Sequence, residues 1–149
     1  PKVLAKRPNA LLDLAGNKMP ADLLKLEMTG VTIRGRVKSA QTFMRDRHVM
    51  VVPLFAAGGM RVKIIEGMAL GKAVISTPIG AEGIDHTEGL NILIARSATE
   101  FAEHMIALDE EPAYMHMLGT EARKLIEARY ADAHVVRELE ALYSRLRPA

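Results

Sequence analysis

The sequence predicts an α/β fold with a parallel sheet, and three observations support this. Short apolar runs that end at glycine or proline alternate with segments of helical periodicity. The connections between them are short, as in βαβ units. The 149 residues, of which 49% are hydrophobic and 26% charged, are enough for one domain with a hydrophobic core.

The strands are predicted where Val, Ile, Leu or Ala cluster in short runs. The first run stops at Gly16, the second at Gly35 and the third at Pro53. Such punctuation is typical of strand ends. The five predicted strands are residues 10–15, 31–33, 48–52, 72–77 and 90–95.

The helices are predicted from apolar spacing and from their terminal residues. Pro20 stands at the first turn of one helix, Ser39 is the N-cap of the next, and Thr99 is the N-cap expected for a later one. The opening residues, 1–6, read like the tail of a helix already under way, as in a piece of a larger protein. The predicted helices are residues 21–28, 39–45, 62–70, one starting at 99, then 112–129 and 133–146.

Composition excludes several classes of function. The formal charge of +2 comes from 20 basic and 18 acidic residues, which gives no reason to expect a nucleic-acid partner. Because the chain has no cysteine, it has no disulfide or thiolate metal site, which fits a cytoplasmic location. No apolar run approaches the roughly 20 residues of a membrane helix. The five histidines show no metal-ligand spacing, so no metal site is expected.

A loop rich in glycine follows the third predicted strand and opens the helix 62–70. Gly58 and Gly59 let a ligand approach the backbone, and the first amides of a helix lack internal partners. With the helix dipole, these amides suit a phosphate group. Arg61 and Lys63 add positive charge there, and Glu66, deeper in the helix, is suited to accept hydrogen bonds from ribose hydroxyls.

A structural interpretation of the same residues stays open. Glycine pairs at helix starts are common, and a lone glutamate in a helix is usually solvated. Glu82 fits a loop or capping role as well as a pocket role, and His86 is interpreted as a solvated loop histidine.

The segment 53–77 resembles the donor-binding segment of retaining glycosyltransferases of the GT-B fold, in the group 1 or family 4-like branch. That family has a proline-closed strand, a glycine-rich loop, K-I-x-E-A-M-A and a G-x-P-V-V strand. It continues with a G-x-E-G loop, here Gly80-Ala81-Glu82-Gly83, and a further strand similar to 89–94. Ala122-Arg123 and Tyr130 resemble its late helix. The resemblance implies a doubly wound, Rossmann-like parallel sheet of about five strands with C-terminal helices.

The resemblance also implies roles for individual residues. Glu66 matches the second glutamate of the family's E-x7-E motif, which binds the ribose, and Val37 matches a position whose backbone meets the base. The substrate would be a nucleotide-diphosphate sugar, with no cofactor. The diphosphate would be held by backbone amides near Met60, Arg61 and Val62.

Two departures from the family pattern limit this assignment. The first glutamate of E-x7-E falls on Gly58, so no catalytic residue is assigned. The family's first strand and its N-terminal acceptor domain are also missing, so residues 1–149 are expected to be one incomplete donor domain, inactive alone. The strands near Leu11 and Val49 would then pair directly or leave open edges, and self-association through such an edge is a hypothesis.

Three further hypotheses concern membrane contact and other classes of protein. A basic lean in the C-terminal helices suggests peripheral contact with an anionic membrane surface. A non-catalytic α/β nucleotide-binding or interaction module is the alternative to an enzyme. A Rossmann-type dehydrogenase is disfavoured because no G-x-G-x-x-G follows the first strand seen here.

Overall fold

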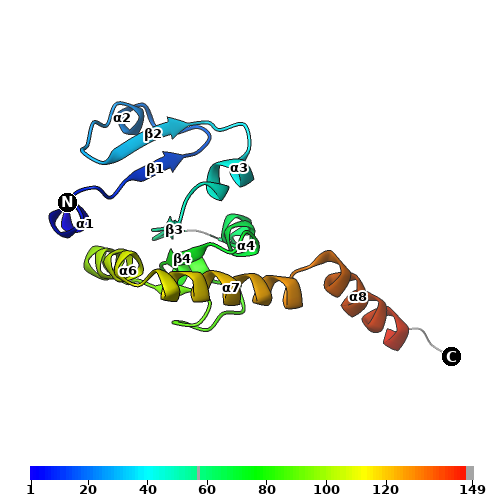
Figure 1. The fold of residues 1–149 in the computed structure, drawn as a ribbon. Coiled ribbons are helices and arrows are strands. Elements are labelled where there is room, and N and C mark those ends of the chain that lie inside the picture. The colour runs from blue at the N-terminus through cyan, green and yellow to red at the C-terminus, as the bar shows by residue number, and fades with distance from the viewer. Residues whose placement is uncertain (57, 147–149) are drawn as a thin grey trace.

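The computed structural model describes residues 1–56 and 58–146 as alternating strands and helices followed by a helical C-terminal part (Figure 1). The strands are β1 (Leu12–Ala15), β2 (Val31–Gly35), β3 (Val49–Val52), β4 (Ala73–Ser76) and β5 (Leu93–Ile94). The helices are α1 (Lys2–Lys6), α2 (Ala21–Leu24), α3 (Ala40–Arg45), α4 (Val62–Ala69), α5 (Pro78–Ala81), α6 (Ala98–Glu110), α7 (Pro112–Arg129) and α8 (Asp132–Leu146).

All strand pairs are parallel, which confirms the predicted fold class, but the strands form two sheets. One sheet has the order β1-β2 and the other has the order β3-β4-β5. Within the described residues, β1 and β3 do not pair, so each keeps one free edge. The prediction left open whether these strands pair directly or leave open edges, and the structure shows open edges.

The hydrophobic core surrounds β4, whose four residues are all buried. On one side, Ile64 and Met68 of α4 pack with Ile126 of α7, and all three are at most 6% exposed. The other cluster joins Ile75 of β4 to α6 and α7 through Phe101, Leu108 and Leu118. Helix α4 is therefore fixed by its buried face, and its start is fixed with it at the end of the loop that follows β3.

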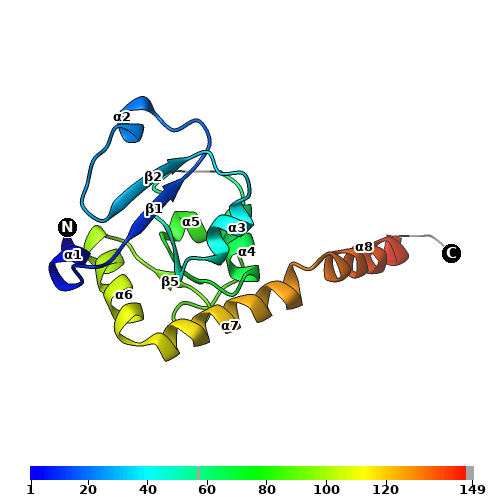
Figure 2. The same ribbon diagram turned by 45° about the horizontal axis from the view of Figure 1, so that its top comes forward.

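The β1–β2 sheet lies apart from this core, with α3 between the two parts (Figures 1 and 2). Ion pairs link the parts. Asp13 of β1 pairs with Arg34 of β2 at 2.6 Å and with Arg47, just before β3, at 2.7 Å. Helix α1 packs beside α6, where Arg7 pairs with Asp109 at 2.7 Å. Charged side chains thus hold the two sheets together where strand pairing does not.

Several predicted boundaries differ from the observed ones. The helix expected at 21–28 ends at Leu24, because Leu24 and Leu26 are 52% and 40% exposed and do not gain the packing that sustains a helix. The strand expected at 90–95 shrinks to Leu93–Ile94, because the side chain of Asn91 accepts a hydrogen bond from the amide of Thr87 and closes a turn.

Helix caps also differ in part. Ser39 caps α3 as predicted, accepting a hydrogen bond from the amide of Thr42 at 3.2 Å. Helix α6 begins earlier than expected, because Ser97 rather than Thr99 is its N-cap and accepts from the amide of Glu100. The short helix α5 was not predicted, although Thr77 followed by Pro78 is a favourable start.

Helix α8 projects away from the rest of the molecule (Figures 1 and 2). Its polar positions hold three acidic and two basic residues, Asp132, Arg137, Glu138, Glu140 and Arg145. One set of apolar side chains is 44% or more exposed: Val135, Val136, Leu139, Leu142, Tyr143 and Leu146.

Candidate nucleotide-diphosphate site

The loops that follow β3 and β4 meet at the carboxyl edge of the three-stranded sheet. The hydroxyl of Thr77, after β4, donates to the carbonyl of Leu54, after β3. Gly83, in the next loop, lies against Met60, since a Cβ built on this glycine would be 3.6 Å from the Met60 Cβ. In open α/β sheets this edge is where ligands bind.

The glycine pair at this edge is unobstructed. A Cβ built on Gly58 or Gly59 meets no atom of the described residues within 4 Å. Gly59 has φ +75°, a conformation that side chains other than hydrogen resist. Gly59 is thus required by the backbone, whereas packing within residues 1–56 and 58–146 does not require a glycine at 58.

The start of α4 presents free backbone amides. The amides of Ile64 and Ile65 both donate to the carbonyl of Arg61, at 2.8 and 3.4 Å. Within residues 1–56 and 58–146, the amides of Val62 and Lys63 have no acceptor. No side chain caps this end of α4. Free amides at the positive end of a helix attract an anion.

Arg61 bridges the two loops with its guanidinium group. Its Nη1 donates to the carbonyl of Gly58 at 2.7 Å, and its Nη2 makes a longer contact of 3.4 Å with the carbonyl of Ile79 in α5. Its Nε is buried and has no hydrogen-bond partner in the described part of the chain. No carboxylate of that part lies within ion-pair distance of Arg61, so its charge is not neutralised there.

Glu66 has a protein partner. Its Oε2 accepts from the Nζ of Lys63 at 2.6 Å, and its side chain is 29% exposed. The sequence analysis assigns the two residues separate roles: Lys63 is a cation near the phosphate, and Glu66 accepts hydrogen bonds from the ribose. Their spacing of three residues on one helix is the signal that could have revealed the pair. The pair occupies one carboxylate oxygen and leaves the other able to accept further hydrogen bonds.

Val37 lies in the loop between β2 and α3, away from the start of α4 in the sequence. It lines a shallow depression of about 330 Å³ together with side chains of α3, among them Thr42 and Phe43. Glu66 and Arg61 do not line this depression. Val37 is therefore next to a hollow, but that hollow does not join it to the glycine loop.

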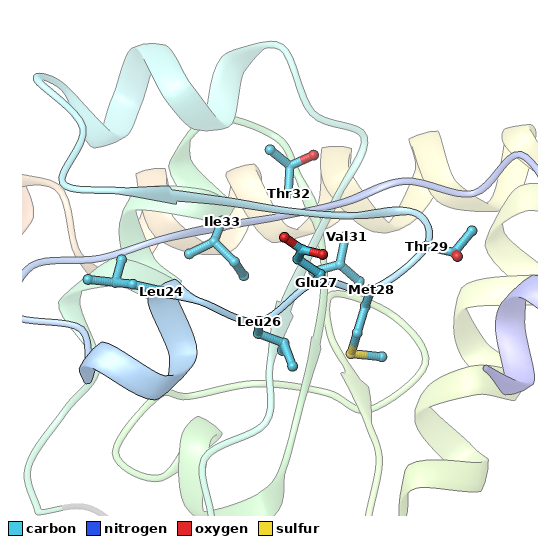
Figure 3. Close-up of a pocket in the computed structure, with 8 residues that line it drawn as sticks. All are labelled: Leu24, Leu26, Glu27, Met28, Thr29, Val31, Thr32 and Ile33. Atoms are coloured by element: carbon cyan, nitrogen blue, oxygen red, sulfur yellow. The ribbon is translucent and has the colours of Figure 1, made fainter.

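A second, larger groove of about 530 Å³ lies between α2 and β2 (Figure 3). Leu24, Leu26 and Ile33 line it, with Glu27 as its charged residue, and none of the predicted site residues does. It lies on the outer β2 side of the two-stranded sheet, away from the loops after β3 and β4, so we do not assign the site to it.

Two further candidates from the sequence, His86 and Glu82, contact nearby backbone atoms. The Nδ1 of His86 lies 2.7 Å from the carbonyl of Ile84. Glu82 ends α5, where its amide donates to the carbonyl of Ile79. Across residues 1–56 and 58–146, His, Asp and Glu side chains form no cluster of metal-binding type. In the same part of the chain, no helix has the length and apolar character needed to cross a membrane.

Parallel strands alternating with helices, with a glycine loop and free helix amides at their carboxyl edge, place the chain among the Rossmann-like α/β domains. The chain belongs to the family of glycosyl transferases group 1, which matches residues 1–111.

The chain is also similar to three individual proteins. An uncharacterized 44.6 kDa protein in the cps region of Klebsiella pneumoniae is 24% identical over 144 residues, covering 91% of this chain and 37% of that protein. HepE of Anabaena, in complex with UDP, has a TM-score of 0.80 at 17% identity, covering 96% of this chain and 43% of the other.

The third is the C-terminal domain of LpcC, a glycosyl transferase group 1 family protein of Francisella tularensis. It has a TM-score of 0.69 at 19% identity, covering 87% of this chain and 74% of that domain. At these identities the structural similarity shows the fold. The chain spans less than half the length of the Klebsiella and Anabaena proteins.

Proposed function

We propose that this chain is the donor-binding domain of a retaining GT-B glycosyltransferase, which moves a sugar from a nucleotide-diphosphate sugar to an acceptor. Membership of the group 1 family supports sugar transfer. The structural similarity to HepE in complex with UDP and to the C-terminal domain of LpcC supports a donor-binding, C-terminal position. The acceptor would be held mainly by a second, N-terminal domain outside this chain.

The observation that carries the proposal is the open glycine at 58. No atom of the described residues excludes a Cβ there, so packing within the described chain gives no reason for the missing side chain. A ligand that approaches the backbone closely does give a reason. The free amides of Val62 and Lys63 lie just beyond, at the start of α4.

The diphosphate would bind at these amides. Peptide N–H groups and the helix dipole both favour a negative group there. Arg61 and Lys63 add two positive charges at the start of the same helix. Because cations at a helix N-terminus are otherwise unfavourable, a bound diphosphate would offset their cost.

Glu66 would hold the ribose and Val37 the base. Lys63 holds one oxygen of Glu66, so the second oxygen is the one available to a ribose hydroxyl. If Lys63 turned toward the diphosphate, it would release the first oxygen as well. The backbone of Val37, at the edge of its shallow depression, would contact the base from the loop before α3.

The domain's contribution to the reaction would be electrostatic. When the sugar leaves, negative charge grows on the nucleoside diphosphate, and amides and cations already aimed at it stabilise that charge. No metal or cofactor is part of the proposal. Because Gly58 replaces the family's first glutamate and the acceptor domain lies outside the chain, we expect no transferase activity from residues 1–149 alone.

A non-catalytic nucleotide-binding or interaction module is the second candidate, and Gly58 in place of that glutamate favours it. We also propose a cytoplasmic location for the protein. Peripheral contact with the inner face of a membrane is a further proposal, although α8 carries more acidic than basic residues and so adds little attraction to anionic lipid.

Calorimetric titration with UDP, UMP and pyrophosphate tests the proposal. We expect UDP to bind more tightly than UMP, because the second phosphate reaches the amides of α4, and more tightly than pyrophosphate, because the ribose reaches Glu66. Equal affinities for UMP and UDP would contradict the proposed diphosphate site. No binding of UDP, ADP or GDP at millimolar concentration would contradict the proposed function. Turnover of a sugar nucleotide by this chain alone would contradict its expected inactivity.

A further inference from the structure

Arg61 is the one predicted site residue whose side chain connects two loops of the carboxyl edge. It reaches back to the carbonyl of Gly58 and across to the carbonyl of Ile79. Two of its five N–H donors are used in this way, and both acceptors are backbone atoms. An arginine held by carbonyls and by no carboxylate of the described chain acts on backbone geometry as well as on charge.

The contact with Gly58 fixes the orientation of one peptide group. In a planar trans peptide the C=O and the next N–H point in opposite directions. The carbonyl of Gly58 points at Nη1 of Arg61, 2.7 Å away, so the N–H of Gly59 points away from the guanidinium. A Cβ at either glycine would meet no atom within 4 Å, so the space around this peptide is open.

A peptide between two glycines has little intrinsic preference for one orientation. Glycine reaches both signs of φ at similar energy, so this peptide can rotate unless another group holds it. Among the described residues, Arg61 supplies the hydrogen bond to the Gly58 carbonyl. Its second contact, to Ile79, ties the guanidinium to α5, whose start is capped by Thr77. The anchor for the peptide is therefore itself fixed from the neighbouring loop.

We infer that Arg61 is a positioning residue that locks the Gly58–Gly59 peptide with the Gly59 N–H directed toward the diphosphate of the donor. The inference rests on the proposed function for the identity of the ligand. It assigns Arg61 a role through the forked shape of its guanidinium, in addition to its charge. The Gly59 amide would join those of Val62 and Lys63 in one anion-binding set.

Two substitutions separate shape from charge. Arg61→Lys keeps the positive charge but replaces the planar, forked guanidinium with a single ammonium group, and Arg61→Met removes both properties. Arg123→Met, in an exposed ion pair on α7, is the matched control for loss of a surface cation. The measurements are the Kd for UDP by calorimetry, the order parameter of the Gly59 N–H by NMR relaxation, and the Tm.

We expect both Arg61 variants to raise the Kd for UDP by roughly tenfold to a hundredfold, the range for one hydrogen bond to a charged group. The order parameter of the Gly59 N–H should fall in both, while Arg123→Met matches the unsubstituted chain. A loss of affinity that only follows a fall in Tm would reduce Arg61 to a structural role and overturn the inference. Full affinity in Arg61→Lys would overturn it too, because charge alone would then suffice.

The proposed function can fail separately. If the unsubstituted chain does not bind UDP, the ligand is wrong, and the order parameter of the Gly59 N–H still decides whether the peptide is locked. A lower order parameter in Arg61→Lys than in Arg123→Met supports the lock, and equal order parameters reject it.

Discussion

At the scale of single residues, one of the two adjacent glycines has a backbone reason to be there. Gly59 has a left-handed backbone, and a Cβ on either glycine meets no atom of the described residues within 4 Å. Sequence reasoning could find the pair but could not show the left-handed backbone, because backbone conformation is not visible in the sequence. The structure gives a folding requirement for Gly59, and we propose a ligand as the reason for Gly58.

We expect different results for the two alanine substitutions. Gly59→Ala should lower the free energy of unfolding by about 1–2 kcal/mol, because alanine resists positive φ. Gly58→Ala should change the free energy of unfolding less, because its methyl group meets no atom of the described residues within 4 Å. It should still weaken UDP binding, because its methyl group fills the approach to the backbone. Urea unfolding and calorimetry measure the two quantities, and UDP affinity retained in Gly58→Ala would contradict the account.

Glu66 shows a second limit of single-residue reasoning. The sequence indicated a lone carboxylate in a largely apolar helix, and the structure pairs that carboxylate with Lys63. Lys63 is 63% exposed, so the pair is of the weak, solvent-screened type and adds little to stability. A pair of this strength can be exchanged for contacts with a ligand.

At the scale of elements, the strongly patterned segments were predictable and the weakly packed ones were not. Strand β4 and helices α4 and α7 were predicted within one or two residues, because their apolar periodicity reflects the burial that holds them. Helix α2 and strand β5 came out shorter, because exposure in one case and a side-chain turn in the other outweighed local propensity.

In the ion-pair cluster of Asp13, Arg34 and Arg47, the pair between Asp13 and Arg47 joins β1 to the start of β3, with which β1 shares no strand pairing. The hydrogen bond from Arg34 holds the pKa of Asp13 below its ordinary value, with a further contribution from Arg47. The folded state therefore favours the charged carboxylate more than the unfolded state does. The stability that ionised Asp13 contributes is fully present above the ordinary pKa of the carboxyl group. It is lost as the pH falls through the lowered pKa of the folded state.

We therefore expect Asp13→Asn to destabilise the chain at pH 7 and to differ less from the unsubstituted chain as the pH drops below about 4. Urea unfolding at pH 7, 5 and 3 measures the difference in unfolding free energy. Asp109→Asn, which weakens the exposed pair between α1 and α6, is the control and should have a smaller effect at pH 7. A constant difference for Asp13→Asn from pH 7 to pH 3 would exclude the ionised cluster as the cause.

At the scale of the whole molecule, the fold class followed from the alternation of strands and helices, but the division into two sheets did not. The local sequence pattern predicts that a segment is a strand, whereas strand pairing depends on which strands meet in space. Strand β3, with the half-buried residues Val-Met-Val-Val, has one free edge, and so does β1. The sequence predicts a candidate site at the glycine loop and α4, and that site stays a prediction. The bridge made by Arg61 could not be predicted, because Ile79 is distant in sequence.

Free strand edges predict that this chain self-associates as its concentration rises. Light scattering should show a mass that increases with concentration. Leu12→Lys, which places a charge on β1, should suppress the increase. Leu11→Lys, just outside the strand and 83% exposed, should not. A constant monomer mass at every concentration would show that the free strand edges do not drive self-association.

The central claim is that the start of α4 holds a nucleoside diphosphate, with Glu66 on its ribose. The most direct measurement is a cycle of four dissociation constants, for the unsubstituted chain and Glu66→Ala, each with UDP and with 2′,3′-dideoxyuridine 5′-diphosphate. Each single change should raise the Kd by roughly tenfold or more, and both together no further than either alone, because they remove the same hydrogen bonds. Unchanged UDP affinity in Glu66→Ala, or two effects that multiply in full, would contradict the account.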